Sequence, residues 1–291
     1  MLKLNIHNFT IEKNVNIKIM HLSDIHYSNL FDPKLEKNII ESVNKNKPDY
    51  IFITGDIIDK YDYLDDKVNQ MKIKKFLVNL SLIAKLFLIF GSHDLENVGN
   101  PKDEFDKSLK KWKNMMKEYK NIYLLDDNYY QDEFINVYGL TLPFSYYHIL
   151  PNENVDIVSD KLNNLPNFDN DKYNILLIHS PRRILNNKCL DKIKSIDLIL
   201  SGHMHDGIVP KIIKKLPTTI GIISPHKTLF PKYARGKKIK KIDNHEIALF
   251  ITGGVTKISP ALPNYMKWFS RFYDNEIEII NIRSKNGNNN R

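Results

Sequence analysis

The sequence predicts an α/β fold with a largely parallel sheet. Short apolar runs rich in isoleucine end at polar or glycine residues, and segments with helical spacing of apolar residues lie between them. The runs are residues 16–22, 50–54, 86–90, 175–178 and 196–200.

In chain order, the first run alternates apolar and polar residues, which predicts a strand covered on one face only. The other four are nearly continuous and predict strands buried on both faces. Between the third and fourth runs, helical spacing relates Phe105, Leu109, Trp112, Met116 and Tyr119.

The segment 125–173 is predicted to be a lid. It contains a hairpin around 133–140, an aromatic stretch at 143–148 and a helix over 155–165. The aromatic side chains form either a substrate wall or part of the core, and the core is favoured.

A polar cluster follows each of the five apolar runs. In parallel sheets ligands bind beyond the carboxyl ends of the strands, so these clusters share one topological position. Alone, each is commonly loop polarity; together they predict a site for two metal ions around a phosphate. They are Asp24-Ile25-His26, Gly55-Asp56-Ile57-Ile58-Asp59, Gly91-Ser92-His93-Asp94, His179-Ser180-Pro181 and Gly202-His203-Met204-His205.

These blocks resemble the calcineurin-like metallophosphoesterase superfamily, whose motifs are D-x-H, G-D-x-x-D, G-N-H-[DE], H and G-H-x-H. The resemblance extends from about Asp24 to His205. It implies a four-layer α/β/β/α sandwich of two mixed sheets, with the site at one edge of the stack. It also implies that the protein is an enzyme, a metal-dependent phosphoric ester hydrolase.

The resemblance assigns a role to each matching residue. Asp24, His26 and His205 hold one metal, and His179 and His203 hold the other. Asp56 bridges both metals. His93 is the general acid or transition-state stabiliser, and Asp94 orients its ring.

One position departs from the family pattern: Ser92 stands where relatives carry an asparagine ligand of the second metal. A hydroxyl on a shorter side chain is a poorer ligand. The second metal is then held more weakly, or the chain is a weakly active or non-catalytic scaffold, and both alternatives stay open.

Two divalent ions roughly 3.5 to 4 Å apart share a bridging hydroxide and stabilise charge on a phosphoryl group. Carboxylate and imidazole ligands suit Mn²⁺, Fe²⁺ or Zn²⁺. The predicted reaction is hydrolysis of a phosphodiester, phosphomonoester or pyrophosphate.

Segments 229–236, 252–255 and 276–280 are similar to a bacterial branch that includes exported or membrane-associated phosphoesterases. Relatives there are often labelled as UDP-diacylglucosamine hydrolases, so an alternative function is a pyrophosphatase of a lipid-linked UDP-sugar. That function requires an apolar groove beside the metals. Residues 230–233 form either a packed turn or a substrate contact, and His226 is a further residue of interest in this segment.

Length and composition predict a single domain over 1–283 and a disordered tail over 284–291. The single cysteine, Cys189, excludes an intrachain disulfide and is expected to be a packing residue. Without a basic-then-apolar leader or an apolar run long enough to span a bilayer, we expect a cytoplasmic protein, with peripheral membrane contact as an alternative.

The net charge of +9 does not come with a nucleic-acid-binding motif, so nucleic acid is an unlikely partner. The expected partner is a phosphorylated small-molecule or lipid-linked substrate. Three lysine groups are solvated faces or contacts to an anionic membrane surface or polyanionic substrate. They are Lys72, Lys74 and Lys75; Lys211, Lys214 and Lys215; and Lys237, Lys238, Lys240 and Lys241.

Overall fold

The computed structural model describes residues 2–95, 101–148, 156–212, 214, 218–225, 228–256 and 272–285. Its strands form two mixed six-stranded sheets. The first sheet, in spatial order, contains β1 (Leu2–Ile11), β12 (Asn275–Ser284), β2 (Ile17–Leu22), β3 (Tyr50–Thr54), β4 (Lys85–Ile89) and β5 (Ile122–Leu124). The second contains β10 (Gly236–Ile242), β11 (His245–Ile251), β9 (Leu198–Ser201), β8 (Tyr173–Ile178), β7 (Ile135–Leu140) and β6 (Asn128–Gln131).

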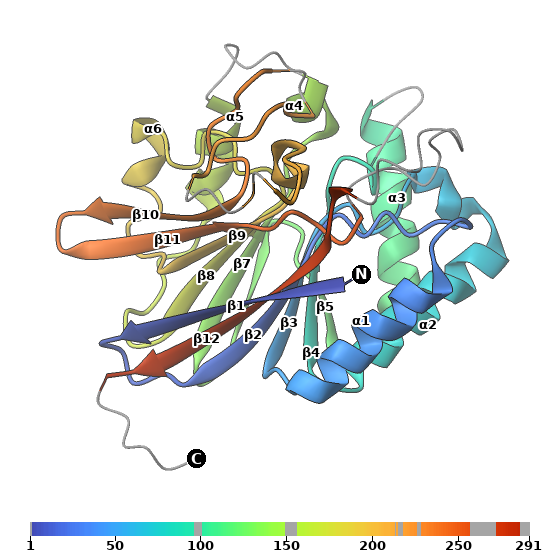
Figure 1. Ribbon diagram of the computed structural model, residues 1–291, viewed down its shortest axis with the longest axis horizontal. Helices are drawn as coiled ribbons and strands as arrows, with labels where there is room; N and C mark the ends of the chain where they lie inside the picture. The colour runs from blue at the N-terminus through green and yellow to red at the C-terminus, as the bar shows by residue number, and fades with distance from the viewer. Residues whose placement is uncertain are drawn as a thin grey trace.

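Helices cover the outer face of each sheet (Figure 1). The first sheet carries α1 (Pro33–Asn46), α2 (Lys67–Ser81) and α3 (Pro101–Met116). The second carries the short helices α4 (Phe144–His148), α5 (Asp156–Lys161) and α6 (Asn187–Leu190). The predicted four-layer α/β/β/α sandwich is therefore confirmed.

Alternation along each strand fills three apolar layers. In β3, Phe52 packs between the two sheets, whereas Ile51 and Ile53 pack against the helices. The same division places Phe87 between the sheets and Leu88 under the helices. Because both faces of these central strands are buried, they are apolar at almost every position.

The predicted one-sided burial of the first apolar run is wrong, because β2 is buried on both faces. Its polar residues are accommodated rather than exposed. His21 is fully buried and its Nε2 lies 2.8 Å from the Thr54 hydroxyl, and burial lowers its pKa to about 3, which keeps the ring neutral. The Lys18 ammonium donates to the carbonyl oxygen of Asn46 at the end of α1.

The segment 125–173 is not a lid over its described part, because it supplies β6 and β7 to the second sheet. The predicted hairpin is confirmed, with Gln131 opposite Asn136. The predicted helix is shorter: α5 ends at Lys161 and a 3₁₀ turn follows at Leu162–Asn164. Residues 149–155 lie outside the described residues.

Several smaller expectations can also be compared with the structure. The helix predicted from Phe105 to Tyr119 is α3, which ends at Met116. Cys189 is free and fully buried in the core of the second sheet. β12 extends to Ser284, one residue into the predicted tail, and residues 286–291 lie outside the described residues. No helix in the described part of the chain has the length and apolar character needed to span a bilayer.

One polar network joins the two sheets at the end opposite the polar clusters. The Asp132 carboxylate, between β6 and β7, accepts hydrogen bonds from Lys85 at 2.9 Å and from the Tyr50 hydroxyl at 2.9 Å. Two backbone N–H groups of its own turn, at Phe134 and Ile135, donate to the other oxygen. Burial raises the pKa of Asp132, but Lys85 and these donors outweigh it and lower the pKa below its ordinary value.

We expect Asp132→Ala to lower the free energy of unfolding by about 2 to 4 kcal/mol, because hydrogen bonds to a charged group are lost and their donors are left half-buried. Chemical denaturation of both proteins at pH 7 measures this difference. Asp65→Ala is the control, since Asp65 pairs with Lys111 at the surface and should cost under about 1 kcal/mol. The difference should shrink as the pH falls below about 4, because a carboxylate with a lowered pKa loses its stabilising effect on protonation.

Candidate metal centre

The five polar clusters meet at one edge of the sandwich, where the carboxyl ends of β2, β3, β4, β8 and β9 come together. Within the first sheet, the Asp24 N–H donates to the Gly55 carbonyl oxygen at 3.1 Å. Between the sheets, the His203 N–H donates to the Asp24 carboxylate, and His179 Nδ1 donates to the carbonyl oxygen of Thr54 at 2.6 Å. The loops of both sheets therefore form one connected site.

The backbone of these loops is strained at the predicted ligands. A positive φ is uncommon for residues other than glycine and costs about 1 to 2 kcal/mol. Such strain concentrates at functional sites. The predicted ligands with positive φ are Asp24 (51°), His26 (49°), Asp56 (49°), His203 (67°) and His205 (46°).

Glycines allow the loops to approach this closely. A Cβ on Gly91 would lie 2.2 Å from Asp56 Oδ1, and one on Gly202 would lie 2.4 Å from Asp24 Oδ2. Gly55 combines a φ of 87° with contact to Gly91 and the His179 ring. In the three blocks that contain a glycine, that glycine is thus required by the packing of the loops around the carboxylates and imidazoles.

Two clusters of ligand atoms result, each with atoms within 4.8 Å of one another. They are Asp24, His26 and His205, and Asp56, His179 and His203. The structure thus brings together the two sets that the resemblance assigns to two metals. Asp56 lies between them, with Oδ2 3.1 Å from His179 Nε2 and 4.0 Å from His26 Nε2. That each set binds a metal stays a prediction.

The residues present fit divalent cations. Two buried imidazole nitrogens, His26 Nδ1 and His205 Nδ1, have no hydrogen-bond partner among the described residues, and the contact of His179 Nε2 is to the Asp56 carboxylate. Burial lowers the pKa of His179, but the carboxylates of Asp56 and Asp24 outweigh it and raise the pKa to about 9. The negative charges of Asp56 and Asp24 favour protonation of the fully buried His179 ring. The same charges favour binding of a metal cation.

His93 is positioned differently from the prediction. Its backbone N–H donates to Asp56 Oδ1 at 2.9 Å, and its ring Nδ1 donates to the carbonyl oxygen of Asp59. The orientation that the resemblance assigned to Asp94 is therefore wrong: the hydrogen bonds of Asp94 come from backbone N–H groups. Its oxygens accept from Ile57, Ile58 and Gly91.

Asp94 instead joins the second and third polar clusters. It is fully buried, and burial together with the nearby Asp56 charge raises its pKa to about 7. The role of this residue is to hold two loops in register. The sequence could not predict these hydrogen bonds, because their backbone donors reach Asp94 only in the folded loops.

Two residues near the site were not singled out from the sequence as ligands or contacts. Asp59 Oδ1 lies 3.7 Å from His26 Nδ1, and with His93 these residues form a third possible metal-binding group. The second is Tyr147 of α4, which is 7% exposed and whose ring packs against His179 and His203. The aromatic stretch is thus core, as favoured, and also the apolar wall of the second group. Asp59 was visible in its motif, and Tyr147 lay in the aromatic stretch that the sequence indicated only as core or substrate wall.

Ser92 is 8% exposed and lies between Gly91 and His93 at the second group's side of the site. Its hydroxyl makes no hydrogen bond to a described residue. Its place in the loop agrees with the prediction, while its role as a ligand stays untested. His226 lies outside the described residues.

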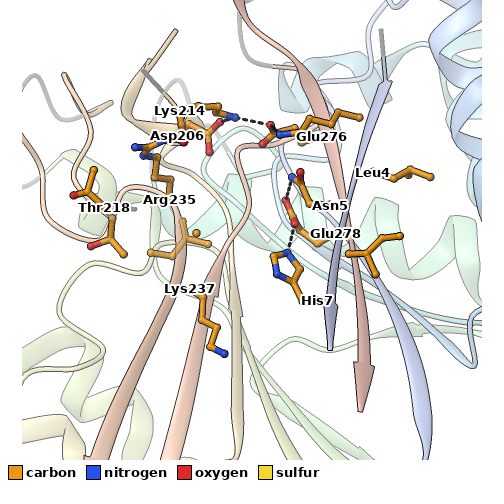
Figure 2. Close-up of a pocket in the computed structure, with 15 residues that line it drawn as sticks. Leu4, Asn5, His7, Asp206, Lys214, Thr218, Arg235, Lys237, Glu276 and Glu278 are labelled. Carbon is orange, nitrogen blue, oxygen red and sulfur yellow. Dashed lines mark hydrogen bonds and ion pairs between the residues drawn. The ribbon is translucent and has the colours of Figure 1, made fainter. Parts of the chain in front are cut away.

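A cavity of about 590 Å³ lies between β1 of the first sheet and β10 of the second (Figure 2). Its carboxylates are already paired: Lys214 contacts Asp206 and Glu276, while Asn5 and His7 contact Glu278. Lys214 is therefore not the solvated cation that was predicted. Its neighbour Lys211 pairs with Asp274, and Lys215 lies outside the described residues.

The other lysine groups lie at the surface. Lys237 and Lys238 are exposed on β10, an edge strand, where lysines discourage pairing with another chain. On α2, Lys72 contacts Asn29 and Lys74 lies over the Tyr119 ring. Contact of these groups with a membrane or polyanion stays a prediction.

Residues 17–207 match the family model described as calcineurin-like phosphoesterase. The chain belongs to this family. Similar curated proteins are uncharacterized metallophosphoesterases. One from Helicobacter pylori J99 is 28% identical over 66% of this chain and 45% of its own length. One from Aquifex aeolicus is 27% identical over 71% of both chains, and YkuE of Bacillus subtilis is 28% identical over 72% of this chain and 63% of its own.

The chain thus spans about half the length of the first Helicobacter relative. Among solved structures, a dimetal phosphatase from Danio rerio is similar over 84% of this chain and 89% of its own, with 9% identity and a TM-score of 0.44. The match to the family model confirms the predicted family, and the exported or membrane-associated branch stays a prediction.

We expect Asp56→Asn to lower the bound Mn²⁺ content and to abolish the rise in unfolding temperature on adding Mn²⁺. The variant keeps the side-chain volume but removes the charge between the two groups. A metal present at 100 times its dissociation constant stabilises the folded state by about 2.7 kcal/mol, and this contribution should disappear. Elemental analysis and thermal unfolding measure both effects. Asp171→Asn at an exposed loop position is the control, and two-metal binding by Asp56→Asn would rule out the bridging role.

Proposed function

We propose that this protein is a metal-dependent phosphoesterase with a dinuclear centre. The observation that supports this most is that Asp56 lies within 4.0 Å of imidazoles from both ligand groups. A site built from two three-residue groups, with the Asp56 carboxylate of one group lying near an imidazole of the other, suits two ions side by side. The ligand types favour Mn²⁺, Fe²⁺ or Zn²⁺.

When bound, two divalent ions supply a nucleophile at neutral pH and neutralise charge on the phosphoryl oxygens. The chain's own residues then orient the reaction. Water oxygen bonds to phosphorus, the ester P–O bond breaks, and the leaving oxygen takes a proton. We assign that proton transfer to His93. Its Nδ1–H donates to the Asp59 carbonyl oxygen, so Nε2 is the nitrogen that would release the proton of the protonated ring.

The non-catalytic alternative rests on Ser92 alone. Against it, the other predicted ligands are brought together at the same strand ends, and several keep a strained backbone. Backbone strain of this kind persists only where the surrounding structure maintains it, and it is concentrated at functional sites. The function proposed here is therefore catalytic, with a second metal that Ser92 holds weakly.

We expect His93→Ala to lower the rate with an unactivated phenyl phosphodiester about 10²- to 10⁴-fold, and the rate with a p-nitrophenyl phosphodiester far less. A good leaving group needs no proton, so only the poor one depends on the acid. Steady-state kinetics in Mn²⁺ compare the two substrates, and metal content should be unchanged. His245→Ala, on the remote strand β11, is the control. Equal losses on both substrates would argue against general acid catalysis.

We expect Ser92→Asn to raise the affinity of the second metal and phosphodiester turnover together, because an amide oxygen reaches further and has a larger dipole. Ser92→Ala should lower both if the hydroxyl contributes through water. Titration calorimetry with Mn²⁺ and kinetics on the three proteins measure this series. Unchanged second-site affinity in Ser92→Asn would show that Ser92 does not limit the site.

A further inference from the structure

A second cavity, of about 420 Å³, is lined in part by the loops that carry His179 and His203 of the second ligand group. Pro181 and Met204 line it, and these residues belong to the metal-binding loops: Pro181 follows His179 by two residues, and Met204 lies between His203 and His205. A phosphate held by the metal ligands would therefore have its organic group beside or inside this cavity. The volume lies in the range of pockets that bind small organic molecules.

The opposite wall of the cavity comes from the segment after the metal motifs. Pro231 and Tyr233 line it, and Tyr233 also packs against the core of the second sheet. With Pro181 and Met204 they give the cavity apolar walls on both sides. Residues 230–233 are thus both a packed turn and a cavity wall, which combines the two alternatives that the sequence left open.

The charged side chains of the cavity are all cationic. Arg182, Arg183 and Lys232 line it, and the described lining contains no aspartate or glutamate. In the cavity of Figure 2, by contrast, three carboxylates stand beside the cations. Apolar walls with three cations, as the described lining of the second cavity has them, favour an organic anion.

The backbone places two successive arginines in the same cavity. In an extended segment their side chains would point to opposite sides. Arg183 has a φ of 69°, which reverses the chain locally. This left-handed conformation costs about 1 to 2 kcal/mol in a residue other than glycine. Both arginines are half-buried, and both line the cavity. The local backbone conformation therefore brings two cationic residues to one cavity.

Aromatic packing connects Arg182 to the ligand groups. Its guanidinium lies 5.7 Å from the Tyr146 ring centroid, and the Tyr146 hydroxyl donates to its carbonyl oxygen at 2.7 Å. Tyr146 packs edge-on against Tyr147 at 5.4 Å, and Tyr147 lies 5.1 Å from the His203 ring. Two tyrosines thereby connect Arg182 to a ring of the second ligand group.

We propose that this cavity is the substrate's organic-group site, and that Arg182 and Arg183 bind a second anionic group carried there. The proposal rests on the proposed phosphoesterase function and names its substrate class: a phosphoester whose apolar, ring- or chain-sized organic part bears a second negative charge. A phosphate and a carboxylate share this chemistry. The two arginines suit phosphate better, because guanidinium groups bind its oxygens in pairs.

A matched set of p-nitrophenyl esters tests this substrate class. The p-nitrophenyl ester of thymidine 5′-phosphate has one phosphate, and the same ester with a 3′-phosphate or a 3′-O-succinyl group adds a second anion without changing the reacting centre. In Mn²⁺ we expect kcat/KM to be about 10- to 100-fold higher with the 3′-phosphate, which corresponds to about 1.4 to 2.8 kcal/mol. A smaller preference for the succinyl ester would mark a site selective for phosphate.

Arginine variants test whether Arg182 and Arg183 cause the preference for the ester with a second anion. Arg182→Ala and the double variant with Arg183→Ala should reduce the ratio of kcat/KM between the two esters toward one, and Arg182→Lys should restore part of it. Lys188→Ala is the control, since this exposed lysine pairs with Asp156 outside the cavity and should leave the ratio unchanged. A ratio that Arg182→Ala and the double variant leave at the wild-type value would overturn the proposal.

Binding measurements test the anion site independently of the proposed phosphoesterase function. Calorimetry compares thymidine 3′,5′-bisphosphate with thymidine 5′-phosphate on the wild-type protein and on the double variant. Tighter binding of the bisphosphate that the double variant loses supports the anion site even if no ester is hydrolysed, an outcome that would refute only the catalytic function. Equal binding of both ligands by the wild-type protein would overturn the anion site even if the esters are hydrolysed.

Discussion

Two buried carboxylates, Asp24 and Asp56, are the constraint around which this fold is arranged. They are 0% and 1% exposed at the edge where the two sheets meet. An ionised carboxylate out of water costs several kcal/mol unless it is hydrogen-bonded or paired. Backbone N–H groups of His203 and His93 supply part of the compensation. The rest must come from cations, and the surrounding imidazoles present the nitrogens that would share them.

That arrangement explains the unusual local structure of the loops. Donors can reach the carboxylates only if the backbone itself approaches them, which requires glycine at positions such as Gly91 and Gly202. The side chains can converge only if the chain reverses directly after each strand, which the positive φ of the ligand residues achieves. The same reversal recurs at Arg183, where it directs two arginines into one cavity.

The α/β class and the common location of the polar clusters could be predicted because each cluster directly follows an apolar run, and the carboxyl ends of parallel strands meet at one edge. The four layers and the two ligand sets were implied by the family resemblance. Features set by tertiary contact could not be predicted. Asp94 follows His93 in the chain, but the folded loops bring it backbone donors from Ile57, Ile58 and Gly91 instead. His21 looks like a solvent-facing residue in the strand pattern, yet it is fully buried beside the Thr54 hydroxyl, and this burial keeps its ring neutral.

The ligand groups also bear on when the site can form during folding. Asp24 and the N–H group of His203 that it accepts are separated by 179 positions, and each ligand group draws residues from both sheets. Closing so long a loop is entropically costly, and contacts of this kind form slowly. A chain that has folded only its first sheet holds neither complete group. Metal binding at the proposed centre would therefore be a late event, and metal supply would act on how much protein stays assembled rather than on how fast the sheets form.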